Sequence, residues 1–422
     1  MKEEKDSKPS ESKEEKKQKI YNVESIYDTY FENLNSVKIY FNKFGNLASG
    51  EDESIKEKSQ EFLDKAFTEI KEEMKLVKNK DDKNDTITKE EAEKLLKKLA
   101  RTLNKKPKIS PRNYEILSRS SFLMLNNYFE YLIADLLSYY YNKFKKSLNE
   151  KEFKFTLKEL NEYESIEEAT KDLIVKEVES LIIEKSFNEL LEHFEEKLSI
   201  SLEKKLIKWS EIIEIRERRH LIVHNSSIVN KKYISRTKNP FNYKIGDVVN
   251  IEKDYFLKSW SQFKLAGQLL IFNCWGNWDK DNADNAIYQI MIQTFDDLNS
   301  KNYNLVCKTC KYSEQIEPKN EDQENYILRI KVNNAISLKK QKKDNEVKKS
   351  LDNIKVGTAT PIFKIAHNIL SDKHDDLEQL FTQAIIVDEL IIDNYLEWPI
   401  FDFVREKEDI NKILIKTFEH KN

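Results

Sequence analysis

The residue types that can do acid–base and phosphate chemistry concentrate in one short stretch, residues 214–225. It contains three of the nine arginines and two of the six histidines of the 422-residue chain. Arginine holds a phosphate through paired donors, and histidine exchanges protons near neutral pH because its unperturbed pKa is about 6.5. This combination fits proton transfer at a bound phosphodiester. The catalytic candidates are Arg219, His220 and His224, and the substrate-binding candidates are Arg216 and Asn225.

Apolar residues around this stretch predict one amphipathic helix over residues 202–225. They recur at the spacing of three and four residues that brings side chains to one helical face. These residues are Leu202, Leu206, Trp209, Ile212, Ile213, Ile215, Ile222 and Val223. At about 100° per residue, both histidines, Arg216 and Arg219 fall in the same apolar arc. Arg218 falls on the opposite side, near Glu211 and Glu214, and is interpreted as a solvated arginine.

Charged residues on an apolar face need an explanation. An unpaired buried charge costs on the order of several kcal/mol, whereas a buried leucine contributes about 1.5 to 3 kcal/mol. The cluster is therefore interpreted either as a catalytic site or as a paired polar network at a helix interface. His220 and His224 also have the i, i+4 spacing of zinc ligands, but no glutamate lies between them as in His-Glu-x-x-His enzymes. We expect no metal and no cofactor.

An arginine and a polar histidine at 219–220, followed by a second histidine at 224 and an asparagine at 225, resemble the Arg-x4-6-His motif of the HEPN superfamily. HEPN proteins place this motif late in a long helix, behind an earlier apolar helix that often carries a glutamate. Here the earlier helix is predicted over residues 113–144, with Glu130 as the glutamate. The resemblance covers roughly residues 111–233.

This resemblance implies a metal-independent endoribonuclease of the toxin or abortive-infection type, which is an antiphage defence effector. In such an enzyme the 2′-hydroxyl of an RNA substrate attacks the adjacent phosphodiester, leaving a cyclic phosphate and a 5′-hydroxyl. By this resemblance His224 transfers protons and Arg219 binds the phosphate. His220 orients the substrate or His224, and Glu130 orients Arg219.

The spacing within the motif favours a homodimer. Five positions along a helix separate Arg219 from His224 by about 7.5 Å and roughly 140°, so one helix does not direct both at one phosphate. Two such helices facing each other across a two-fold axis provide both residues to one cleft, as in the composite sites of HEPN ribonucleases. We also expect a regulatory protein or nucleic acid to act through the N-terminal or C-terminal helical region.

A non-catalytic interpretation stays open beside the enzyme. In it, the chain is a helical interaction scaffold, and the Arg/His cluster is a polar network at its dimer interface. The two interpretations differ in what His224 does: an enzyme needs it for activity but not for folding, whereas a polar network needs it for dimer stability.

Composition narrows the class of protein. The net charge is −3 and 63 of the 72 basic residues are lysine, so no overall basic field holds nucleic acid and any RNA site must be local. No stretch reaches the ~18 apolar residues of a membrane helix, and the first residues lack a signal-peptide core. We expect a cytoplasmic protein. Its three cysteines fit a reducing compartment, and Cys307 and Cys310 are interpreted as buried helix residues rather than metal ligands.

With only six glycines and seven prolines, the chain is expected to be mostly α. We predict a HEPN-like helical bundle between an N-terminal helical region and a C-terminal array of helical hairpins, which loosely resembles tetratricopeptide repeats. At most one short β-hairpin is expected, over residues 243–251. The predicted regions are a disordered charged tail 1–20, an N-terminal helical region 21–108 with a loop near Gly50, a bundle 109–258 with the catalytic helix 202–225, and a helical-hairpin region 259–422. Ser110 and Pro111 are expected to start the earlier helix.

Overall fold

The computed structural model describes residues 22–78, 88–104, 112–148, 156, 158, 162–354 and 360–421. The predicted disordered tail 1–20 and the helix start at Ser110 and Pro111 lie outside these residues. The described part contains 16 α-helices and three short 3-10 helices but no strand. The mostly α fold class is therefore confirmed.

The first half of the chain supplies the helices α1 Val23–Lys78, α2 Lys89–Leu103, α3 Asn113–Lys143, α5 Ile166–Glu184, α6 Phe187–Glu196, α7 Trp209–His224 and α8 Lys231–Thr237. The second half supplies α9 Lys253–Trp278, α10 Ala283–Asn299, α11 Tyr303–Ser313, α12 Glu321–Lys340, α13 Asp344–Asp352, α14 Pro361–Leu370, α15 Leu377–Ile386, α16 Ile392–Glu397 and α17 Glu408–Lys421. The 3-10 helices are η1 Lys145–Leu148, η2 Lys280–Asn282 and η3 Pro399–Phe403.

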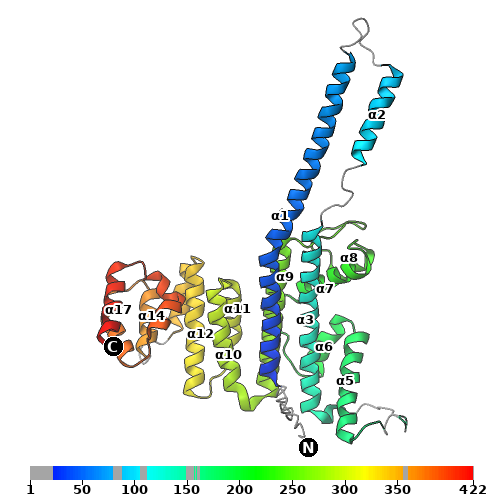
Figure 1. The fold of residues 1–422 in the computed structure, drawn as a ribbon. Coiled ribbons are helices and arrows are strands. Elements are labelled where there is room, and N and C mark those ends of the chain that lie inside the picture. Colours follow the sequence, from blue (N-terminus) through cyan, green and yellow to red (C-terminus); the bar gives the residue numbers. More distant parts are fainter. Residues whose placement is uncertain are drawn as a thin grey trace, which may run out of the picture.

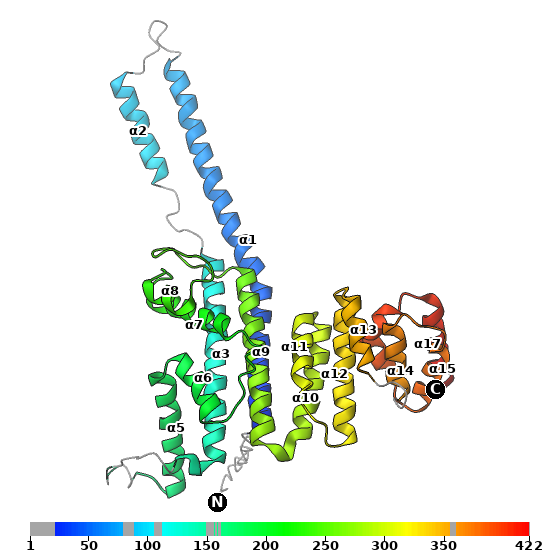
Figure 2. The same cartoon turned by 180° about the vertical axis from the view of Figure 1, so that it is seen from behind.

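Three long helices, α1, α3 and α9, lie side by side at the centre of the molecule (Figure 1). The helices α5 to α8 pack on one side of them, and α10 to α17 extend from the other side as stacked hairpins (Figures 1 and 2). The distal half of α1 and the antiparallel α2 project away from this body as a two-helix arm. The helix α7, which carries the candidate residues, therefore packs on a helical body. Two extensions, the arm and the C-terminal hairpins, leave this body in different directions.

Aromatic rings join the three central helices. Phe129 of α3 stacks on Phe263 of α9, with ring centroids 4.8 Å apart, and Phe41 of α1 stacks on Phe256 of α9 at 3.8 Å. One buried core thus contains residues from all three helices. This core extends across residues 108 and 258, where the sequence analysis placed boundaries between regions.

The prediction of a loop near Gly50 is wrong, because α1 runs without a break from Val23 to Lys78. A glycine inside a helix costs only about 1 kcal/mol relative to alanine. Ala48, Glu51 and Glu53 near Gly50 are good helix formers, and nothing lies within 4 Å of where its Cβ would be. One glycine is therefore too weak a signal to end this helix.

The predicted hairpin over residues 243–251 is also wrong. This segment pairs instead with the residues that follow α7, through one antiparallel bridge between Ile228 and Val248. The amide of Val249 donates to the carbonyl of Ser227 at 2.9 Å, and the amide of Val229 donates to the carbonyl of Asp247 at 2.8 Å. The segment's hydrogen bonds thus hold the end of α7 instead of closing a hairpin.

Candidate functional site

The helix that carries the Arg/His cluster is shorter than predicted, since α7 begins at Trp209 and not near Leu202. Residues 202–208 form a turn in which Glu203 has a positive φ of 46° and its carbonyl accepts the amide of Ile207 at 2.8 Å. The indole of Trp209 donates to the carbonyl of Leu202 at 2.7 Å. Leu202 and Leu206 are buried although they are not helical, and their spacing of four residues is what predicted a longer helix.

Glu130 of α3 lies between two arginines of α7. Its Oε1 accepts a hydrogen bond from Arg216 Nη2 at 2.8 Å, and its Oε2 lies 3.9 Å from Arg219 Nη2. The guanidinium of Arg216 also lies over the ring of Phe187 in α6, 4.5 Å from its centroid. All three charged side chains are partly exposed, at 22 to 29%. The earlier helix thus brings its glutamate to the motif arginine, and also to Arg216.

The two histidines lie against each other at the C-terminal end of α7. Their ring centroids are 4.7 Å apart, and the His224 side chain is exposed. Burial lowers the pKa of His220 below 6.5, and the neighbouring His224 adds to this effect. An imidazole with a lowered pKa is neutral at pH 7 and can accept a proton. His220 is therefore suited to act as a proton acceptor or as a hydrogen-bonding group.

Asn225, predicted to bind substrate, is the C-cap of α7. Its side-chain amide donates to the carbonyl of Ile228 at 2.5 Å, and its backbone amide donates to the carbonyl of Leu221 at 2.9 Å. Ser226 and Ser227 follow with positive φ angles. The asparagine side chain therefore stabilises the turn that ends the motif helix.

The interpretation of Arg218 as a solvated arginine is wrong. Its side chain is only 2% exposed, and its Nε donates to Glu214 Oε1 at 2.9 Å. The ring of Tyr255 lies 3.8 Å from the guanidinium, and Tyr255 and Tyr233 both donate hydroxyl hydrogen bonds to Glu214. A paired, hydrogen-bonded and stacked arginine can be buried.

These contacts divide α7 into two charged faces with different surroundings. One face holds Arg216 and Arg219 beside Glu130 of α3, and the two histidines, of which His220 lies near Lys232 and Arg236 of α8. The other holds the Glu214–Arg218 pair under the chain that returns from α8 to α9, where Arg218 Nη1 donates to the carbonyl of Asn250 at 3.2 Å. The first face is accessible to a ligand, and the second is structural.

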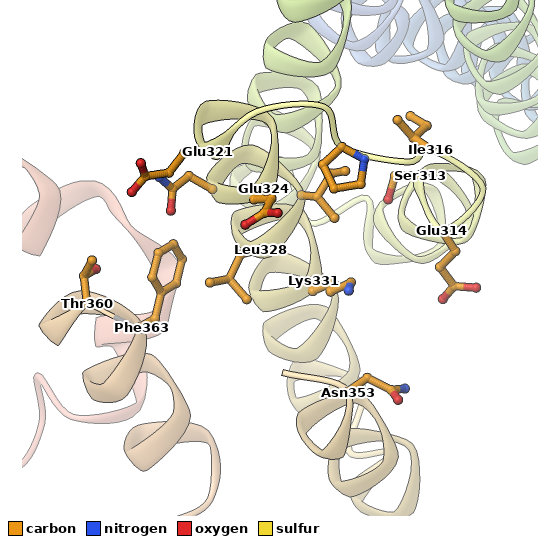
Figure 3. Close-up of a pocket in the computed structure, with 13 residues that line it drawn as sticks. Ser313, Glu314, Ile316, Glu321, Glu324, Leu328, Lys331, Asn353, Thr360 and Phe363 are labelled. Atoms are coloured by element: carbon orange, nitrogen blue, oxygen red, sulfur yellow. The ribbon is translucent and has the colours of Figure 1, made fainter. Parts of the chain in front are cut away.

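A groove that the sequence did not predict lies in the C-terminal helical array (Figure 3). It has a volume of about 600 Å³ between α11, α12 and α14. Glu314, Glu321, Glu324 and Lys331 line it together with Leu328 and Phe363 (Figure 3). These residues come from three helices without a shared motif, so no local sequence signal could have identified them. They include no histidine or cysteine.

All three cysteines lie in helices: Cys274 and Cys310 are buried and Cys307 is partly exposed. Within the described ranges, no group of three or more histidine, cysteine, aspartate or glutamate side chains is arranged to hold a metal ion. No described helix combines the length and the apolar character needed to cross a membrane.

Comparison of the chain with models of protein families, with curated proteins and with solved structures finds no match.

Proposed function

We propose that the chain is a metal-independent endoribonuclease whose active site forms between the α7 helices of two copies. The observation that carries this proposal is the arrangement of Glu130, the two arginines and the two histidines on one accessible face. Glu130 lies 2.8 Å from Arg216 and 3.9 Å from Arg219. One carboxylate therefore orients two guanidinium groups but neutralises only one of their two positive charges. Oriented arginines that keep a net positive charge can bind a phosphate more strongly than ordinary exposed cationic side chains.

In the proposed reaction, the 2′-oxygen of a ribose forms a bond to the adjacent phosphorus and the bond to the 5′-oxygen breaks. A neutral histidine accepts the 2′-hydroxyl proton, and a protonated histidine of the second copy donates a proton to the departing 5′-oxygen. His224 is assigned to proton transfer, and Arg219 stabilises the charge that develops on the phosphate. The products carry a 2′,3′-cyclic phosphate and a 5′-hydroxyl.

The resemblance to HEPN toxins supports a role in abortive infection and antiphage defence, within the cytoplasm. The competing function is a scaffold in which the same Arg/His cluster closes a dimer interface. One observation favours this competitor: Val223, between the two histidines, is 46% exposed, and an exposed aliphatic side chain suits an interface.

The proposed activity is tested by incubating purified protein with mixed RNA in EDTA and mapping the ends of the fragments. Wild-type protein should cleave in the chelator and leave cyclic phosphate ends. His224→Ala should lose cleavage and keep its circular dichroism spectrum, whereas His367→Ala, a histidine of α14, should cleave normally. Activity that disappears in EDTA and returns with a divalent metal would refute the mechanism.

Dilution tests the composite site. Activity per protomer should fall when the concentration drops below the dimer dissociation constant, because each cleft needs residues from two copies. Full activity of a monomer, shown by light scattering at the assay concentration, would remove the composite site. Loss of dimerisation in His224→Ala without any RNA cleavage by the wild type would favour the scaffold.

A further inference from the structure

The two-helix arm has two unlike sides. Ala66 of α1 and Leu95 of α2 lie in the seam between the helices, where Ala66 is buried and Leu95 half-buried. At about 100° per residue, Phe67 and Met74 lie about 80 to 100° round α1 from that seam. Leu96 and Leu103 likewise lie about 80 to 100° round α2 from Leu95, rotated in the same direction about the helix axis.

These four residues share one side of the arm. Because α1 and α2 run antiparallel (Figure 1), equal rotations in the same sense bring side chains to the same side of the pair. Phe67 is 53% exposed and Leu96 63%, while Met74 and Leu103 are 38% and 36% exposed. No other described element covers the arm in either view (Figures 1 and 2). The arm therefore presents an apolar side to solvent.

The opposite side of the arm is charged and complementary. The same helical steps place Glu69 and Glu72 there on α1, and Glu73 lies only about 20° from the seam on that side. These steps place Lys94, Lys98 and Arg101 there on α2. Lys98 forms an ion pair with Glu73. A charged side of this kind is well solvated and needs no partner, whereas an exposed apolar side is typical of an interaction surface.

The Lys98–Glu73 ion pair also fixes the register of the two helices. In that register, Phe67 is level with Leu103 and Met74 is level with Leu96. A two-fold axis parallel to the arm on its apolar side keeps each residue at its own height and exchanges the helices. Phe67 of one copy then meets Leu103 of the second copy, and Met74 meets Leu96.

We propose that the arm is a dimerisation element, which forms a four-helix bundle with the arm of a second copy. Each α1 lies between its own α2 and the α2 of the second copy, so all neighbouring helices are antiparallel, as in up-and-down bundles. The contact is isologous, because the same patch serves on both copies. In-register matching of four exposed apolar residues is what favours a second copy over an unrelated partner helix. The proposal does not depend on the proposed catalytic function, and one closed dimer uses both contacts only if the arms and the α7 helices share the same two-fold axis.

Sedimentation equilibrium of the full chain tests the arm. The wild type should be a dimer, and the double variant Phe67→Glu/Leu96→Glu should raise its dissociation constant at least 100-fold with an unchanged circular dichroism spectrum. Ile183→Glu on α5 is the matched control, because Ile183 is 79% exposed outside the arm. A monomeric wild type would overturn the proposal, and so would a dimer that the arm variant leaves intact.

Cross-linking between different single variants tests the register, in a Cys307→Ser background. A mixture of Phe67→Cys protein with Leu103→Cys protein should form a disulfide dimer. Phe67→Cys mixed with Leu96→Cys should not form a disulfide. Leu96 lies seven residues from Leu103, which is about 10 Å along α2 and too far from Phe67 of the second copy. The reverse pattern would mean another packing and would overturn the two-fold arrangement. Binding of monomeric protein to phosphatidylserine vesicles through the same residues would assign the face to a membrane instead.

Discussion

At the scale of single residues, the two adjacent arginines of α7 have different surroundings. Arg218 is 2% exposed and paired with Glu214, whose side chain is 4% exposed. Arg219 is 29% exposed and only 3.9 Å from Glu130. The helix turns by about 100° between them, and this turn separates a structural arginine from a candidate phosphate ligand.

Arg218→Ala should destabilise the fold by about 3 to 5 kcal/mol, because it leaves the carboxylate of Glu214 buried without its cation. Arg219→Ala should keep the fold and lose RNA cleavage. Urea denaturation followed by circular dichroism, with cleavage rates measured on the same preparations, checks both. An Arg218→Ala protein as stable as the wild type would contradict the buried pair.

The His220 imidazole should titrate below 6.5, mainly because it is desolvated and secondly because His224 is close. His224→Ala should therefore raise the pKa of His220 part of the way back. The sign for stability follows from linkage: a histidine whose pKa is lowered by folding destabilises the protein as pH falls below about 6.5, since the unfolded chain binds the proton first. Histidine-resolved NMR titration measures the pKa, and a value for His220 above 6.5 would show that the site is more solvated.

At the scale of elements, the crossing of α1 and α9 depends on Gly267. A Cβ at Gly267 would lie 2.2 Å from the ring of Tyr30. That ring cannot easily move, because the Tyr30 hydroxyl donates to the carbonyl of Phe263 at 2.8 Å and is buried with it. The close approach of the two helices thus requires a residue without a side chain.

Gly267→Ala should lower the free energy of unfolding by about 1 to 3 kcal/mol or more, as overpacking of a core does. Gly276→Ala is the control in the same helix, because nothing lies within 4 Å of its added Cβ. It should be neutral or stabilising by up to about 1 kcal/mol, the gain in helix propensity. Guanidinium denaturation of both variants measures the difference, and equal stabilities would contradict the crossing.

At the scale of the whole molecule, one buried polar network connects the central helices to the C-terminal array. Lys264 of α9 pairs with Asp297 of α10 at 2.5 Å, and both side chains are at most 5% exposed. Gln293 donates to Asp297 at 3.2 Å and accepts from the Tyr27 hydroxyl of α1 at 2.8 Å. The N-terminal helix α1 and the helices α9 and α10 therefore meet at this ion pair.

Lys264→Met should cost about 3 to 5 kcal/mol, because Asp297 then stays buried with an uncompensated charge. The double variant Lys264→Met/Asp297→Leu should recover most of this loss, since neither charge remains. Thermal unfolding by calorimetry compares the three proteins. A double variant less stable than Lys264→Met would show that the ion pair stabilises the fold by more than the cost of desolvating its two charges.

Local sequence properties determined the helical class, the position of α3 and the residue types of the candidate site. Few glycines and prolines, with apolar residues at helical spacing, are sufficient for the class. They also placed α3 within one residue of its observed end, Lys143. Arg216, Arg219 and the histidines share one face of α7 because helix phase depends only on the residue numbers.

Tertiary structure alone decided which neighbours those residues have. Arg218 is buried because Tyr255 and the carbonyl of Asn250 contact it, and Tyr233 hydrogen-bonds its partner Glu214, all from chain that follows α7. The helix start at Trp209 could not be predicted, because Leu202 and Leu206 are buried in a turn and keep the spacing of four residues that a helix has. Burial and pairing come from segments distant in sequence, and periodicity along a single helix carries no information about them.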